Sequence, residues 1–416
     1  MKFSVFTPTH NTYKLRRAYE SLLAQTYSDW EWIIVPNGEV TLEGILSALG
    51  LETKPDNIKI VPLQSKSIGA LKQFACKQAA GDYLVELDHD DELTPDCLEE
   101  LNKTFTTDSN LDFAYSDTGE IREDGSPNLY NPRLGFERYT QMINGRVITA
   151  MKAFPPSPVS FSRVWYGPNH VRAWKRSFYE KIGGHDANRA VLDDHDLVAR
   201  TYINGRVAHI PKCLYVYHWT EKNTSQEALV NPDIQQETLN IHDKYIFQMI
   251  DKWAQLEGFP LVDLCAGDDT LTRWHPVDLK TGVDLDKHPW PFADNSIGAF
   301  RAFDALEHLK SPLETMKEIY RCLIPGGWLL SLTPSTDGRG AFQDPTHVSY
   351  WNSNAFWYYT RREQAQFIGT PVRFQKIYLK NYFPTDFHKE HNILYVRADL
   401  IAVKDEAHRP PGPIEI

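Results

Sequence analysis

The chain has 416 residues, of which 42% are hydrophobic and 24% are charged, as in ordinary folded globular proteins. This length exceeds one ordinary hydrophobic core and predicts two or three domains. The formal net charge is −11, from 44 basic and 55 acidic residues, which argues against a protein that holds nucleic acid or anionic lipid by a general positive field. No apolar run approaches the roughly eighteen residues of a membrane-spanning helix, so we expect none.

The cysteine pattern and the first residues bear on location. The five cysteines are odd in number, scattered and never spaced Cys-x-x-Cys, so we expect reduced thiols. The segment Met1-Lys2 runs directly into an apolar stretch at 3–6, which predicts a first strand and not a signal peptide. Together these observations predict a cytoplasmic protein.

The first half of the chain alternates short apolar strands with helices. The predicted strands cover 3–6, 30–35, 58–61 and 83–85, and the predicted helices cover 13–25 and 68–79. This alternation predicts parallel strands with crossover helices, the arrangement of a doubly wound α/β domain.

A dense acidic stretch follows the strand at 83–85. Asp88, Asp90 and Asp91 lie within four positions, where their charges repel. Such a cluster is tolerated at the carboxyl end of a strand when a hard divalent cation neutralises it, and open α/β sheets bind nucleotides at that edge. The stretch therefore predicts a nucleotide-diphosphate site; the alternative is a solvated acidic turn.

Several motifs in this order resemble an inverting nucleotide-sugar glycosyltransferase of family 2 with the GT-A fold. They cover roughly the first 225 residues: Thr-Pro-Thr-His-Asn (7–11), Asn-Gly (37–38), Ala-Gly-Asp-Tyr (80–83), Leu-Asp-His-Asp-Asp (87–91), Gly-Gly-His-Asp (183–186) and Asp-Asp-His-Asp-Leu (193–197). An ordered set is more specific than one short motif.

The resemblance implies a donor site for a nucleoside-diphosphate sugar. Pro8 and Thr9 would line the base pocket, and Lys72 would face the diphosphate. Asp88 would hold the donor ribose or sugar. Asn37 stands where the family often has an Asp that contacts a uracil ring; we favour a UDP-type donor, although this departure leaves the base open.

The resemblance also implies a metal, Mn²⁺ or Mg²⁺, and a catalytic base. Asp90 would bind the metal with Asp88, and His218 would complete the shell unless it is an ordinary core or surface histidine. Asp194 would remove the proton of the acceptor hydroxyl. Asp193, in place of the usual Glu, would lie on the acceptor side; the alternative is that both aspartates cap the helix predicted at 197–202.

The segment 153–170 is rich in prolines and aromatic rings. Trp165 and Tyr166 would stack on a glycan or another hydroxyl acceptor, or else the rings of this segment belong to the core. A helix predicted over 231–257 carries an apolar stripe and connects to the second half. We expect a GT-A domain at 1–228, a connector at 229–257, a second domain at 258–405 and a tail at 406–416.

The second half restarts the strand-and-turn pattern and resembles a class I S-adenosylmethionine-dependent methyltransferase with its own doubly wound, Rossmann-like sheet. The motifs are the strand and turn at 261–267, Pro-Trp-Pro-Phe-Ala-Asp-Asn-Ser (289–296), Leu-Glu-His (306–308) and Pro-Gly-Gly (325–327). Strands predicted at 373–379 and 393–403 would form the antiparallel pair that ends such a sheet.

By this resemblance, Asp263 and Gly267 would form the cofactor turn, and Asp278 would accept hydrogen bonds from the ribose of S-adenosylmethionine. Asp284 or Asp286 would meet the adenine, and spacing does not decide between them. His347, in the loop expected to hold the methyl acceptor, would be a general base or simply an ordered loop histidine.

We therefore predict a bifunctional transferase that moves a sugar to a hydroxyl and methylates a hydroxyl, with the same glycan as one candidate for both steps. Cys265 replaces the first motif glycine, and the loop at 267–275 is short. These departures motivate an alternative, in which the second domain is a non-catalytic binding or scaffold module. A second alternative is a glycosyltransferase that modifies a nucleic-acid base, which the acidic composition does not support.

Overall fold

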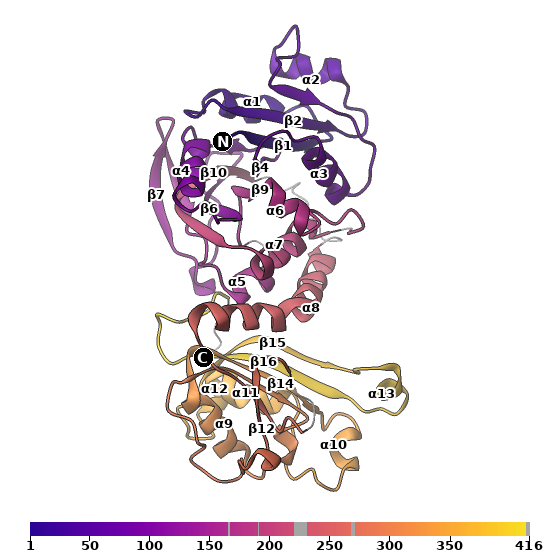
Figure 1. Ribbon diagram of the computed structural model, residues 1–416, viewed down its shortest axis with the longest axis vertical. Coiled ribbons are helices and arrows are strands. Elements are labelled where there is room, and N and C mark those ends of the chain that lie inside the picture. Colours follow the sequence, from indigo (N-terminus) through magenta and orange to yellow (C-terminus); the bar gives the residue numbers. More distant parts are fainter. Residues whose placement is uncertain (165–166, 190, 220–230, 268–270, 413–416) are drawn as a thin grey trace. The chain divides into compact units, whose positions relative to one another are not determined.

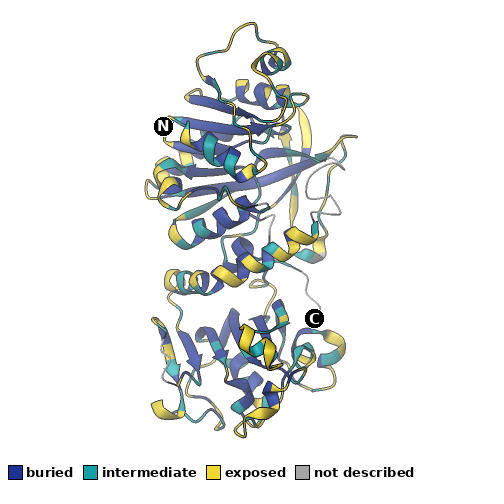
Figure 2. Ribbon diagram, turned by 90° about the vertical axis from the view of Figure 1, so that its right-hand side faces the viewer, coloured by how far each residue is buried: buried dark blue, intermediate teal, exposed yellow. Residues whose placement is uncertain are grey.

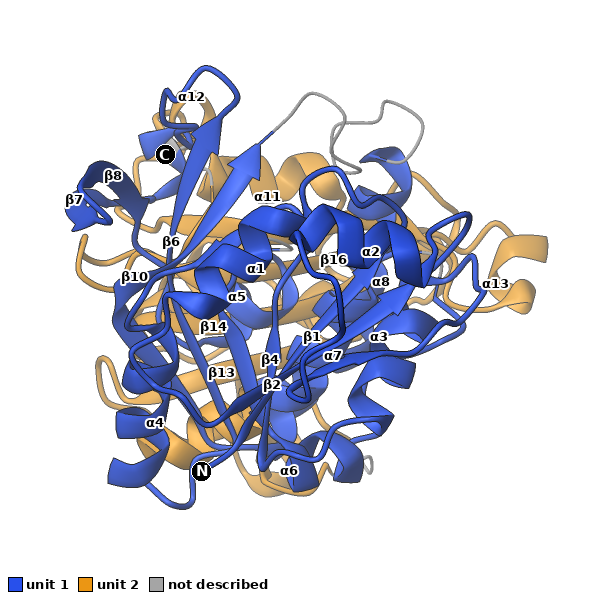
Figure 3. Ribbon diagram, turned by 90° about the horizontal axis from the view of Figure 1, so that it is seen from above, with its two compact units in different colours: residues 1–249 blue, residues 250–416 orange. Residues whose placement is uncertain are grey.

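The computed structural model describes residues 1–164, 167–189, 191–219, 231–267 and 271–412. The chain divides into two compact units, Met1–Met249 and Ile250–Ile416 (Figure 3). The finer domain limits that the sequence suggests stay a prediction.

The first unit is built on a sheet with strand order β3-β2-β1-β4-β9-β6-β10-β5 (Figure 1). Its central strands β1, β2, β3 and β4 are parallel, as predicted, whereas β9 runs antiparallel to both β4 and β6. The bounds of the strands in this unit are β1 Phe3–Thr9, β2 Trp30–Pro36, β3 Ile58–Ile60, β4 Tyr83–Glu86, β5 Glu92–Leu93, β6 Phe113–Arg122, β7 Arg138–Ile143, β8 Arg146–Met151, β9 Arg172–Lys175 and β10 Val207–Trp219.

Helices flank this sheet, and both faces of its central strands are buried. Alternate residues enter two different apolar clusters: Phe3 and Val5 lie in one, and Phe6 in the other. Figure 2 shows these strands as mainly buried. The bounds of the helices are α1 Leu15–Leu23, α2 Leu42–Leu49, α3 Ile68–Lys77, α4 Cys97–Thr107, α5 Pro158–Ser162, α6 Arg176–Lys181 and α7 Asp193–Asn204. Burial on both faces explains why these strands are continuous apolar runs in the sequence.

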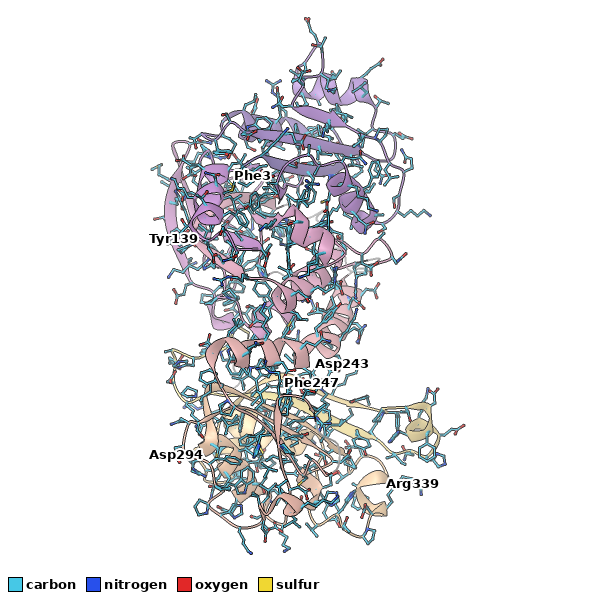
Figure 4. All side chains as sticks on the ribbon, viewed as in Figure 1. Phe3, Tyr139, Asp243, Phe247, Asp294 and Arg339 are labelled. Carbon is cyan, nitrogen blue, oxygen red and sulfur yellow. The ribbon has the colours of Figure 1, made fainter. Side chains whose placement is uncertain are left out.

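The hairpin of β7 and β8 has no counterpart among the predicted strands. Its strands lack a long apolar run. β8 pairs with β6 and with β7, so the hairpin branches from β6 outside the strand order given above. Tyr139 of β7, labelled in Figure 4, donates a hydrogen bond to Asp117 of β6 over 2.9 Å. The hairpin is thus fixed to the main sheet by a polar contact as well as by strand pairing.

The helix α8 (Asn231–Glu257) has the bounds that the sequence predicts. Four of its apolar residues, Ile234, Ile241, Tyr245 and Met249, pack in the core of the first unit. Its early part is therefore a packed element of that unit and not a flexible linker.

The second unit has a six-stranded sheet of order β12-β11-β13-β14-β16-β15. The first four are parallel, and β16 runs antiparallel to both β14 and β15, which confirms the predicted final pair. The bounds are β11 Leu261–Leu264, β12 Trp274–Val277, β13 Ile297–Phe303, β14 Leu323–Pro334, β15 Phe374–Tyr382 and β16 Tyr395–Ala402, with helices α9 Pro312–Cys322, α10 Gly340–Gln343, α11 Ser353–Thr360, α12 Arg362–Ala365 and α13 Asp386–Glu390.

The connection from β11 to β12 is short, as expected, and contains no helix in its described parts, 265–267 and 271–273. Among the helices that the structure describes, none combines the length and the apolar character needed to cross a membrane.

Candidate active site

Glu86 is the central charge of the site in the first unit. It is the last residue of β4, and its side chain is only 1% exposed. The ammonium of Lys72 lies 2.6 Å from Oε1, and the guanidinium of Arg172 lies 3.5 Å from Oε2. Burial raises the pKa of Glu86, but Lys72 and then His170 and Arg172 hold it well below its usual range. The carboxylate is therefore ionised and balanced by buried cations.

Two contacts extend from Glu86 toward the predicted functional aspartates. His170 Nε2 lies 3.7 Å from a Glu86 oxygen and 3.8 Å from Oδ2 of Asp88. On the other side, Arg172 Nη1 donates to Oδ2 of Asp194 over 2.7 Å. Asp88 and Asp194, which are far apart in sequence, are thus connected through His170, Glu86 and Arg172. The structure brings together the predicted sugar-binding acid and the predicted base.

Asp194 is ionised and partly accessible. Its side chain is 25% exposed, and its Oδ1 accepts the backbone N–H of His195. Burial raises its pKa, but the charge of Arg172, followed by that of Lys72, lowers it well below the usual range. The carboxylate therefore keeps lone pairs available for a proton at any physiological pH.

Asp193 is placed differently from the prediction. Although it is the first residue of α7, its side chain is only 5% exposed and lies 3.9 Å from the Lys72 ammonium. Within the described part of the chain, its Oδ2 is buried and has no hydrogen-bond partner. Burial raises the pKa of Asp193 to about 6. The prediction that it faces an acceptor is wrong, because α3 packs over it: a Cβ at Gly69 would lie 2.9 Å from the Asp193 Cβ.

Lys72, which by the resemblance would face the diphosphate, has an ammonium that contacts Glu86 and approaches Asp193 inside the unit. Its contact with a diphosphate stays a prediction. Burial lowers its pKa, but the charges of Glu86 and then of Asp193 and Asp194 raise it by more than burial lowers it, so Lys72 stays protonated. Its role in this structure is to neutralise buried carboxylates.

The predicted base pocket lies at the ends of β1 and β2. Pro8 and Thr9 are the last residues of β1, and the N–H of Asn37 donates to the carbonyl of Thr9 over 2.8 Å. The Asn37 side chain exchanges two hydrogen bonds with the backbone of Ser65. The structure thus groups these three residues, while their contact with a base stays a prediction.

The acids of the 88–91 stretch divide into two kinds. The side chains of Asp88 and Asp90 are 34% and 25% exposed, and neither carboxylate accepts a hydrogen bond from the residues described. Asp91 is buried, and it accepts hydrogen bonds from the Tyr215 hydroxyl and from the His218 backbone, each over 2.8 Å. Burial, together with the charges of Asp88 and Asp90, raises its pKa well above the usual range. Asp91 is therefore a structural acid.

Two neighbouring, partly exposed carboxylates of this kind fit a divalent cation, since its charge would relieve their repulsion. Asp88 also lies within 4.8 Å of donor atoms of Glu86 and His170. His218 does not join this group: its Nε2 lies 2.8 Å from Oε1 of Glu92. We therefore leave His218 out of the metal shell.

The predicted acceptor residues Trp165 and Tyr166 lie outside the described residues. Near the same segment is a small hollow, lined in part by the aromatic rings of Tyr130, Phe136 and Phe154. Asn169, the neighbour of His170, also lines it. Flat rings and polar groups together are suited to a sugar.

In the second unit the predicted cofactor residues have different surroundings. Asp263 is buried in β11, and both of its oxygens accept from Arg301, over 3.0 and 2.8 Å. It forms an ion pair within the sheet, and its role in the cofactor turn stays a prediction. Gly267 has a φ of +58°, and a Cβ there would meet no atom of the described residues within 4 Å. Asp278 and Asp284 are half-buried acids after β12, and each accepts a nearby backbone N–H, from Lys280 and Asp286 respectively.

The loop histidine predicted as a base in this unit, His347, is nearly buried. Its Nδ1 lies 3.1 Å from the carbonyl oxygen of Ala341, and its ring packs edge-on against that of His308. The ring is thus held in place by backbone and by a second imidazole.

Comparison with known families agrees with both halves of this description. Residues 4–166 match the model of glycosyl transferase family 2, and residues 270–331 match that of a methyltransferase domain. The first match lies in the first unit and the second in the second unit, and we call these the glycosyltransferase unit and the methyltransferase unit. The two α/β sheets, GT-A-like and Rossmann-like, are those that this pairing implies.

The curated relatives match part of this chain. The hyaluronan synthase of Pasteurella multocida is 29% identical over 234 residues, which is 54% of this chain and 21% of that protein. The chondroitin synthase of Escherichia coli is 28% identical over 243 residues, 56% of this chain and 31% of that protein. The chain thus spans about a fifth to a third of the length of these relatives.

Among solved structures, that of S. aureus TarS 1–349 in complex with UDP-GlcNAc is 18% identical, with a TM-score of 0.44. The likeness covers 58% of this chain and 65% of that one.

Sequence reasoning missed three residues of the glycosyltransferase site: Glu86, His170 and Arg172. The sequence did contain an indication of Glu86, because an acid at the end of a buried apolar strand requires a counter-charge. His170 and Arg172 lie more than eighty positions away, and no motif spacing connects them with Glu86.

Replacing Arg172 with Met tests the buried charge balance. The variant leaves Glu86 and Asp194 without their shared cation, and we expect the free energy of unfolding to fall by about 3–5 kcal/mol. The measurement is chemical denaturation. Arg16→Met is the matched control, because its ion pair with Glu20 is exposed and should contribute at most about 1 kcal/mol. A loss in Arg172→Met no larger than that of the control would contradict the central role of the cluster.

The raised pKa of Asp193 predicts a pH dependence of stability. Between its ordinary value near 3.8 and about 6, the folded protein keeps this proton while the unfolded chain releases it. The free energy of unfolding therefore decreases as pH rises through this window, by about 1.4 kcal/mol for each pKa unit. Asp193→Asn should remove this part of the slope in denaturation curves measured from pH 4 to 7. An unchanged slope would show that Asp193 is not the group responsible.

Proposed function

We propose that the glycosyltransferase unit transfers a sugar, with inversion, from a nucleoside diphosphate to an acceptor hydroxyl. The observation that carries this proposal is the connection between Asp88 and Asp194 through His170, Glu86 and Arg172. It gives one edge of the sheet an acid pair suited to the donor and a separate acid suited to the acceptor.

On the donor side, Asp88 and Asp90 would hold Mn²⁺ or Mg²⁺, whose charge would offset the negative charge that develops on the leaving diphosphate. The grouped ends of β1 and β2, with Thr9 and Asn37, are the proposed base pocket. Reciprocal bonding to the Ser65 backbone fixes the Asn37 amide, which favours the recognition of a base edge by a pre-oriented group.

On the acceptor side, Asp194 would take the hydroxyl proton as the anomeric carbon is attacked. Its pairing with Arg172 keeps it ionised and fixes its direction, but also weakens it as a base. A weak base suits a reaction in which the hydroxyl becomes strongly acidic only as its bond to the sugar forms. The aromatic hollow beside Asn169 is the proposed acceptor site, and a glycan is the acceptor class that its rings favour.

We also infer that the methyltransferase unit binds S-adenosylmethionine and methylates a hydroxyl, on the same glycan in the simplest case. The open turn at Gly267 and the acid Asp278 after the next parallel strand support this inference. In the rival proposal this unit only binds or scaffolds, and the positive φ of +54° at Cys265, in place of a glycine, motivates it.

Replacing Asp194 with Asn tests the base assignment. After a screen of nucleotide sugars identifies a donor, we expect the variant to lose about 10²- to 10⁴-fold in kcat for transfer, because the amide cannot accept the proton. Asp124→Asn, in an exposed turn, is the matched control. Calorimetry with S-adenosylmethionine should give the same affinity for both variants. Transfer by Asp194→Asn at the wild-type rate would refute the assignment.

Calorimetry on the full chain tests the inferred cofactor. We expect S-adenosylmethionine to bind, and Asp278→Asn to weaken binding about 10-fold, because hydrogen bonds to a charged group contribute about 1.5–3 kcal/mol. Asp294→Asn, whose carboxylate is exposed and labelled in Figure 4, should bind as the wild type does. Absence of binding to the wild-type chain would favour the scaffold proposal.

A further inference from the structure

Three potential metal ligands meet in the methyltransferase unit. Glu307 and His308 lie in the short helix that follows β13, and His347 lies in the loop between α10 and α11. One donor atom from each side chain lies within 4.8 Å of the other two. Among the described residues, the other such group is the one around Glu86 and Asp88, which belongs to the glycosyltransferase unit.

Glu307 contributes a buried carboxylate to this group. The residue is 1% exposed, and its Oε2 accepts from the Thr333 hydroxyl over 2.6 Å. Its backbone carbonyl accepts from Val348 and Ser349, which ties the acid to the loop that carries His347. Within the described chain, Oε1 is buried without a hydrogen-bond partner. A buried carboxylate oxygen left unpaired is unfavourable, and a cation would compensate it.

The two imidazoles are oriented as metal ligands are. Nδ1 of His308 lies 3.3 Å from the Thr346 carbonyl oxygen, and Nδ1 of His347 lies 3.1 Å from that of Ala341. A ring nitrogen that faces a carbonyl must carry the proton, so Nε2 of each neutral ring keeps its lone pair. An oxygen of Asp344 lies 3.9 Å from Nε2 of His347, beyond hydrogen-bonding distance. Backbone carbonyls fix metal-binding histidines in this way.

We propose that Glu307, His308 and His347 bind one divalent transition metal ion, whose open positions take the hydroxyl oxygen of the methyl acceptor. Two imidazoles and one carboxylate favour ions such as Zn²⁺, Co²⁺ or Fe²⁺ over Mg²⁺ or Ca²⁺. Three protein ligands leave room for further oxygens.

The place of the cluster fits this role, which rests on the proposed methyl transfer. The strand β13, which leads to Glu307, pairs in parallel with β11, so the cluster and the turn after β11 lie at the same edge of the sheet. The metal would thus lie beside the proposed cofactor turn. There the acceptor oxygen forms a bond to the methyl carbon, the methyl–sulfur bond breaks with its electrons left on sulfur, and the hydroxyl proton passes to solvent. His347 is then a ligand and not the base predicted from sequence.

The loop that brings His347 to the cluster also exposes aromatic side chains. Phe342 at the end of α10 and Tyr350 are 61% and 54% exposed, and their rings lie 5.3 Å apart. Arg339, labelled in Figure 4, is exposed at the start of the same helix. An acceptor coordinated at the metal would therefore have rings and a cation next to it, which suits a glycan.

Titration of the full chain with Co²⁺, followed by visible absorption and calorimetry, tests the site. An Asp88→Asn and Asp90→Asn background removes the ligands proposed in the glycosyltransferase unit, and we expect one equivalent of Co²⁺ to remain bound. Adding His308→Ala or His347→Ala should weaken this binding at least about 10-fold. His391→Ala, an exposed histidine of the same unit, is the matched control and should bind as the background does.

Glu307→Gln gives an independent variant, because the amide oxygen can still accept from Thr333 while the charge is lost. Circular dichroism and chemical denaturation show whether each variant is folded. Equal Co²⁺ affinity in the background and in all three ligand variants overturns the metal site. Co²⁺ binding that depends on the three residues supports the site, even if S-adenosylmethionine does not bind and the proposed methyl transfer fails.

Discussion

The ion pairs of Glu86 organise the glycosyltransferase unit. A carboxylate closing a strand that is buried on both faces is stable only with counter-charges, and Lys72 and Arg172 supply them. Lys72 comes from α3 and Arg172 from β9, so the charge balance fixes these two elements at the end of β4. Because Arg172 also holds Asp194 at the start of α7, the position of the proposed base follows from the neutralisation of Glu86.

Each unit has a buried acid at or just after the end of a strand, and the two acids differ in how their charge is compensated. In the first, Glu86 is neutralised by cations of the protein, and the neighbouring Asp88 and Asp90 accept no hydrogen bond from the described residues. In the second, Glu307 follows β13, and within the described chain only one of its oxygens is paired. A buried acid with its own cation supports a fold, whereas an unpaired oxygen is available to a ligand. This difference separates structural carboxylates from candidate ligands in both sheets.

Much of the fold follows from periodicity, since apolar runs with crossover helices leave few arrangements other than parallel sheets. The sequence also indicates Asp88, Asp90 and Asp194 as candidate functional acids, because neighbouring carboxylates repel one another and are tolerated only where something offsets their charge. The places of Lys72 and Asp263 did not follow, because their partners, Glu86 and Arg301, lie 14 and 38 positions away and no local pattern reports such pairs. Arg172 shows the same limit: its place is set by tertiary packing, about which motif spacing carries no information.

The buried acid Asp91 has a consequence for how the acidic stretch responds to substitution. It connects β10 to the acidic stretch through the Tyr215 hydroxyl and the backbone of His218. Among the described residues, Asp90 has no such structural contact through its carboxylate, so a substitution there would act on binding. A substitution of Asp91 would instead leave the Tyr215 hydroxyl and the His218 N–H without their acceptor. Adjacent acids in one motif thus carry unrelated physical roles.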